Sequence, residues 1–127
     1  MKSKTKKCTK VETLEEFLKK IEDINEDIAA VSENVDKLKT VNSKIINEPS
    51  QIERKKLVSV QEEIIQRNKS VGKKLQKVIK EEKQKLASIP KDLRSSDFTI
   101  KDTQLKNSSK RFFDLWTQYN NIQLDYR

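Results

Sequence analysis

Residues 13–49 read TLEEFLKKIEDINEDIAAVSENVDKLKTVNSKIINEP, and this stretch alone predicts one long helix. Its apolar residues alternate at intervals of three and four, with Asn42 as the polar exception: Leu14, Phe17, Ile21, Ile24, Ile28, Val31, Val35, Leu38 and Ile45. This is the a/d spacing of a helix that packs against other helices. Thr13 and Glu16 form a capping-box pattern at the start. Pro49 ends the helix because the residue before a proline avoids the helical region.

Two further helices follow. Ser50 and Glu53 repeat the capping-box pattern, and loop residues at 88–90 and 94–96 separate the second helix from a third that opens near Asp97. We expect helices at residues 13–46, 50–87 and 97–127, joined by short connections that make neighbours antiparallel. The second helix should place these residues in the core, with Asn68 as a polar interruption: Leu57, Val60, Ile64, Val71, Leu75 and Val78. The predicted fold is all-α, an elongated antiparallel up-down-up three-helix bundle.

The expected core of the bundle draws on all three helices. The side chains predicted to be buried are Phe17, Ile24, Ile28, Val35, Ile64, Val71, Leu75, Phe112, Leu115 and Tyr119. Charged residues make up 38% of the chain and hydrophobic ones 33%, with one Gly and two Pro, which is typical of long helices with solvated faces. No apolar run approaches the roughly 20 residues that span a bilayer. The isolated domain is expected to be a monomer.

The composition also argues against an enzyme. The chain has no histidine, so the usual base near neutral pH and the commonest metal ligand are missing. The lone Cys8 can build neither a zinc site nor an internal disulfide, and no glycine-rich loop is present. Adjacent glutamates such as Glu62 and Glu63 point about 100° apart on a helix and do not converge. We therefore predict no catalytic residue, cofactor or metal.

Charge is unevenly distributed over the chain, whose net charge is +8. The first helix is acidic and the second is rich in lysine. The simplest interpretation is that the flanks of these two helices are complementary and that the remaining lysines are solvated. An acidic protein partner or an anionic membrane surface is the alternative. We do not predict nucleic-acid binding, because the lysines are mixed with glutamates and lack interleaved aromatic residues.

The second and third helices carry apolar residues beside their expected core positions. On the second helix these include Ile65, Gly72 and Ile79, and on the third they are Phe113 and Trp116. If the two helices are neighbours, the extra stripes would border a groove for a fourth helix. The predicted groove residues are Ile65, Lys69, Gly72, Gln76, Ile79, Phe113, Trp116, Asn120, Gln123 and Arg127. In the simpler interpretation, Phe113 and Trp116 belong to the core and Gly72 is a tolerated surface glycine.

The chain resembles the N-terminal domain of the syntaxins, the Qa-type SNAREs of membrane fusion. The resemblance is most specific in the third helix, at Tyr119-Asn120, Gln123 and Asp125-Tyr126-Arg127. It covers about residues 14–127. In the first helix it includes Phe17-Leu18, Glu22, Ile24, Ile28, Asn34-Val35, Ser43 and Ile45, and toward the third helix it adds Arg94-Ser95-Ser96, Thr103-Gln104 and Phe112. The match in the second helix, at Ile64, Val71 and Leu75, rests on hydrophobic spacing.

The resemblance implies a function. In that family this region is the Habc domain, a three-helix bundle whose groove between the second and third helices can hold the protein's own SNARE helix. Fusion regulators of the SM class bind it. The resemblance also implies a SNARE motif and a membrane anchor downstream, with the domain on the cytoplasmic face of a plasma membrane or endomembrane. The only membrane contact expected on these grounds is through that anchor.

Residues 1–12 form a basic tail that we expect to be flexible. Some syntaxins begin with a short peptide that occupies a pocket on the SM protein. The corresponding residues here would be Lys4, Thr5 and Cys8, although the acidic residue and the leucine of that peptide are absent. A solvated tail, or one resting on anionic lipid, is the alternative. For the whole chain, the alternatives are a spectrin-like scaffolding bundle and a basic helical domain that binds membrane or nucleic acid.

Overall fold

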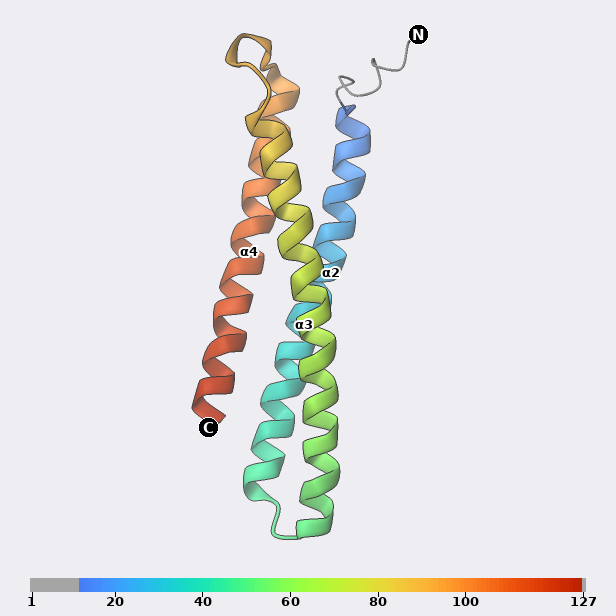
Figure 1. Ribbon diagram of the computed structural model, residues 1–127, viewed down its shortest axis with the longest axis vertical. Coiled ribbons are helices and arrows are strands. Elements are labelled where there is room, and N and C mark those ends of the chain that lie inside the picture. Colours follow the sequence, from blue (N-terminus) through green and yellow to red (C-terminus); the bar gives the residue numbers. More distant parts are fainter. Residues whose placement is uncertain (1–11, 127) are drawn as a thin grey trace.

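The computed structural model describes residues 12–126, and the side chains of residues 12–124. It contains three long helices, α2 (Leu14–Asn47), α3 (Gln51–Ala87) and α4 (Ser96–Tyr126), and a short 3-10 helix, η1 (Lys91–Leu93). No strand occurs in this part of the chain. The three helices lie side by side and alternate in direction along one long axis (Figure 1). The predicted up-down-up three-helix bundle is therefore confirmed.

The helix starts follow from local hydrogen bonding. The Thr13 hydroxyl accepts the Glu16 N–H at 3.1 Å, and the Glu16 carboxylate accepts the Thr13 N–H at 3.0 Å, so the first capping box is complete. The second is only half formed. The Ser50 hydroxyl accepts the Glu53 N–H at 3.3 Å, but the Ser50 N–H donates to the carboxylate of Glu48 instead of that of Glu53. The Glu53 side chain forms an ion pair with Lys56, one turn further along the helix.

The core runs along the facing sides of all three helices. Its buried hydrophobic members are Phe17, Ile21, Ile24, Ile28, Val31, Val35, Leu38, Val41, Ile45, Ile64, Leu75, Ile79, Leu86, Leu105, Phe112 and Tyr119. Val71 and Leu115, predicted to be buried, are only half-buried. On α3 the buried face also contains Gln61, Asn68, Gly72 and Glu82.

The predicted core positions of α3 were therefore partly wrong. The buried face lies between two neighbouring helices, so it is turned toward α4 relative to a simple a/d ladder. Leu57, Val71 and Val78 lie at the edge of that face and are half-buried. Val60 is 47% exposed. It belongs to the end of α3 near the α2–α3 turn, and α4 ends before it reaches the level of that turn (Figure 1).

Polar pairs between the helices set their relative register. Between α2 and α3, Gln61 donates to Asn42 at 2.7 Å and Asn34 donates to Asn68 at 3.3 Å. At the far end of this pair of helices, Lys20 donates to the buried carboxylate of Glu82 at 3.4 Å. A one-turn slip of α3 would separate all three pairs and leave buried polar atoms without partners, which is costly.

Three further interactions connect α4, the start of the described chain and α2. The Ser108 hydroxyl donates to the side chain of Asn25 at 2.8 Å. The buried Lys101 donates to the backbone carbonyl of Glu12 at 2.6 Å, and the Glu12 carboxylate pairs with Lys20 at 2.7 Å. The predicted tail therefore extends too far by at least one residue, because Glu12 is held against the bundle. No helix among the described residues is both long enough and apolar enough to cross a membrane.

Candidate functional site

The residues predicted to border a groove on α3 divide into two sets. Gly72 and Ile79 are buried and Ile65 is half-buried, whereas Lys69 and Gln76 are exposed. The apolar members are therefore part of the interface between α3 and α4, and they do not form an open wall. The heptad spacing of this stripe was a correct signal for helix packing, but the packed helix is α4 of the same bundle.

Gly72 explains how the two helices approach each other. A Cβ atom built on Gly72 would fall within the Trp116 ring, 2.5 Å from Cζ3 and 2.8 Å from Cζ2. The absence of a side chain at position 72 therefore makes room for the indole of α4. Both sequence interpretations of this glycine were incomplete, since it is neither an open landing point for a partner helix nor an indifferent surface glycine.

Aromatic rings on either side fix the position of Trp116. Its ring centroid lies 5.5 Å from that of Phe112 and 4.8 Å from that of Tyr119, at tilted angles. Such tilted contacts are favourable beyond the apolar area that they bury. Burial raises the pKa of Tyr119 above its ordinary value, and the nearby Gln123 side chain opposes this shift. The half-buried Trp116 thus forms the rigid floor between α3 and α4.

The exposed residues around this floor form the candidate site. We define the α3–α4 face as Lys69 and Gln76 on α3 and Phe113 and Asn120 on α4, all exposed, above the buried Gly72 and the half-buried Trp116. The exposed fraction of Phe113 is 70%. Gln123 is half-buried, and Arg127 lies outside the described residues.

Leu124 is a residue that the sequence analysis missed. It is 64% exposed and follows Asn120 by about one turn, so it extends the same flank of α4. Leu124 follows Phe113 by eleven residues, which is about three helical turns, so the two residues share one face of α4. This spacing is the sequence signal from which Leu124 could have been predicted. Lys4, Thr5 and Cys8, the predicted peptide residues of the tail, lie outside the described residues.

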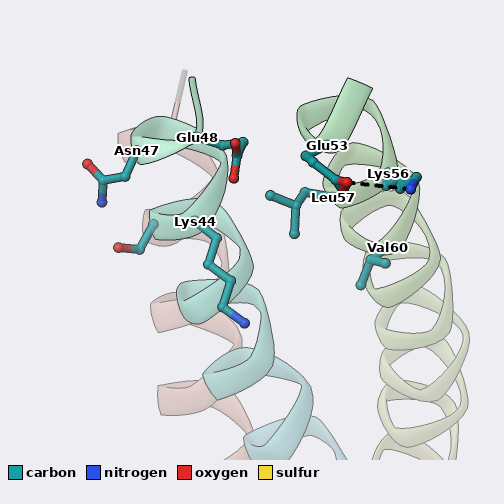
Figure 2. A pocket seen from close by; sticks show the side chains of 8 residues that line it. Lys44, Asn47, Glu48, Glu53, Lys56, Leu57 and Val60 are labelled. Atoms are coloured by element: carbon teal, nitrogen blue, oxygen red, sulfur yellow. Dashed lines mark ion pairs between the residues drawn. The ribbon is translucent and has the colours of Figure 1, made fainter. Parts of the chain in front are cut away.

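A separate hollow lies between α2 and α3 near their turn. Its volume is about 520 Å³ and it is open to solvent. Figure 2 shows Lys44 and Glu48 on one side and Leu57 and Val60 on the other, with the Glu53–Lys56 ion pair at the rim. No predicted site residue lines it. With a charged rim and two apolar residues, it has the character of a protein-contact surface and lacks the converging polar groups of a small-molecule site.

The chain matches one family along nearly all of its length. The family model described as Syntaxin matches residues 11–127. The fold also matches a chain of the Unc18–syntaxin 1 complex from Monosiga brevicollis, with a TM-score of 0.79 and 16% sequence identity. The match covers 96% of this chain and 58% of that chain, so the present chain spans somewhat more than half of its length. The structural match establishes the three-helix fold. The family match extends over more than half of the residues, and the chain therefore belongs to the syntaxin family, the SNARE proteins of vesicle transport and membrane fusion.

Proposed function

We propose that this chain is the N-terminal regulatory domain of a syntaxin-type SNARE that acts in vesicle docking and membrane fusion. In this role it binds an SM-class regulator and holds a SNARE helix, its own or a cognate one, on the α3–α4 face. Family membership supports the general role. The matched Monosiga brevicollis structure contains Unc18, an SM protein, which supports that class of partner.

The observation that carries the SNARE-helix part of the proposal is the exposure of Phe113. Phe17 and Phe112 are buried in the core, whereas Phe113 leaves most of its ring in water beside Trp116. Aromatic residues at the centre of an interface commonly supply much of its binding energy. An amphipathic helix on this face would cover Phe113 and Leu124 with its apolar stripe.

The polar residues of the face would then fix the register of the bound helix. Asn120 and Gln76 are exposed on α4 and α3, on either side of the Trp116 floor, and their amides can donate and accept hydrogen bonds. Lys69 adds a positive charge on the α3 side. This combination of an apolar anchor with flanking polar groups is the usual form of helix recognition in a groove.

The test compares two substitutions of equally exposed apolar residues. Phe113→Ser should weaken binding of the SNARE segment of the full-length protein, added in trans, by about tenfold or more. Ile52→Ser is the matched control, because Ile52 is 71% exposed on α3 but lies outside the α3–α4 face. Isothermal titration calorimetry measures both. Gly72→Leu is unsuitable as a blocking substitution, because the leucine would displace Trp116 and disturb the bundle itself.

The outcomes separate the two parts of the proposal. Equal affinity of wild-type and Phe113→Ser domains would mean that the SNARE helix does not bind on this face. Absence of binding to both the SNARE segment and the cognate SM protein would remove the proposed function and leave the family and the fold unchanged.

A further inference from the structure

Basic side chains near the middle of α3 fall into two groups that differ in their partners. On one flank, Lys74 pairs with Asp27 of α2 at 3.1 Å, and Arg67 pairs with Glu63 at 2.9 Å. The Lys74–Asp27 pair matches the expected complementarity of the first two helices, whereas the Arg67–Glu63 pair lies within α3. Lys69, Lys73, Lys77 and Lys80 are all exposed, and none has an acidic partner among the described side chains.

These four lysines share one side of α3, which we call the lysine face. Lys55 and Lys83, which also have no acidic partner among the described side chains, are not counted in it. At 100° per residue the four lysines of the face occupy a sector of the helix surface about 80° wide. The centre of this sector lies roughly 100° from Gly72, which faces α4, and roughly 100° from Lys74, which faces α2. They extend over about 16 Å of the helix axis at 1.5 Å per residue. The sequence from Ile64 to Lys80 contains no Asp or Glu, and Glu62 marks the end of the face toward the α2–α3 turn.

We propose that the lysine face is a docking surface for an anionic phospholipid membrane. Lys74, on the flank of α3 that faces α2, has its charge compensated by Asp27, so the uncompensated positive charge is concentrated on the solvent-facing side of α3 between its α2 and α4 flanks. Each lysine that lies within a Debye length of an anionic membrane surface is attracted to it by roughly 1 kcal/mol.

The residue type and its surroundings favour a membrane over an acidic protein. Lysine is depleted in the cores of protein interfaces, where a fixed geometry and an apolar anchor are needed. A flexible ammonium group is strongly hydrated and acts as a point charge, which suits a fluid layer of phosphates. The acidic residues Glu22, Asp23 and Glu26 are exposed on α2, so a membrane would attract α3 and repel α2, which gives the domain a defined orientation.

The test uses the 127-residue chain and vesicles of phosphatidylcholine with about 30% phosphatidylserine, an anionic surface of the kind found on the cytoplasmic leaflet. Wild type should co-sediment with these vesicles at low salt, not with pure phosphatidylcholine, and should dissociate as salt rises. The triple variant Lys73→Gln, Lys77→Gln and Lys80→Gln should lower the partition coefficient about a hundredfold, since each lysine contributes about fivefold.

A second triple variant controls for net charge. Lys19→Gln, Lys39→Gln and Lys44→Gln removes the same charge from exposed, unpaired lysines of α2 and should bind within a few-fold of wild type. Glutamine and lysine have similar helix propensities, so both variants should keep the wild-type circular dichroism. Equal loss in both triple variants would overturn the proposal, because binding would then follow net charge alone. Absence of wild-type binding at low salt would also overturn it and would leave an acidic protein as the class of partner that the face fits.

Discussion

Replacing Gly72 with alanine should destabilise the bundle, although alanine is the better helix former. The added methyl group gains up to about 1 kcal/mol of helix propensity. It also enters the space of the Trp116 ring, since an ideal Cβ lies 2.5 Å from Cζ3. Phe112 and Tyr119 hold the indole in place, so the ring cannot move without losing contacts. Overpacking of this kind costs about 1–3 kcal/mol. The expected net loss is therefore up to about 2 kcal/mol.

The sign of the effect should depend on Trp116. In a Trp116→Leu background the methyl group has room, and Gly72→Ala should then stabilise the domain by up to about 1 kcal/mol. The coupling between the two positions would be about 1–3 kcal/mol in a double-mutant cycle. Urea denaturation followed by circular dichroism measures it, since Trp116 is the only tryptophan and cannot report on its own removal. Ser70→Ala, at an exposed site nearby, should give the same small gain in both backgrounds. If Gly72→Ala stabilises the domain equally in both, the proposed packing of Trp116 on Gly72 is wrong.

Three further predictions concern the core, the pH dependence and the tail. Phe112→Ala should cost about 3–5 kcal/mol, because Phe112 is only 6% exposed, and urea denaturation showing less than about 1 kcal/mol would contradict its core position. Burial raises the pKa of Tyr119 above its ordinary 10.0, so its contribution to stability is complete below pH 10.0 and is lost as pH rises through the folded pKa. The pKa of Lys20 is also raised, mainly by its hydrogen bond to Glu12, so its contribution to stability is likewise lost at alkaline pH. Tyr119→Phe should therefore remove only part of the decrease in melting temperature that occurs at alkaline pH. If the tail is an SM-binding peptide, deleting residues 1–10 should weaken binding to the cognate SM protein, and Thr5→Ala should reproduce much of that effect in calorimetry. Unchanged affinity after the deletion would exclude such a peptide.

The sequence by itself determined the elements of this protein. The three-four spacing from Leu14 to Ile45 repeats every seven residues, and such a pattern can bury its apolar stripe only as a helix that packs on other helices. Thr13 and Pro49 bounded the first helix because capping and proline geometry act within a few residues. The family resemblance was also visible in the chain, at Tyr119 and Asn120 among others, and the family match confirms it.

Only the tertiary structure decided which side of each helix meets which neighbour. The apolar stripe containing Gly72 indicated close approach, but the sequence could not say that the approaching group was Trp116 of the same chain. Likewise, α3 has a net positive charge, and only the placement of Asp27 shows that Lys74 is compensated while Lys73 is not. The periodicity of a sequence specifies where each side chain lies around the axis of its own helix. Which side chains of two helices meet depends on how each helix is rotated relative to its neighbours, and in this bundle the polar contacts Asn34–Asn68 and Asn42–Gln61 help to set that rotation.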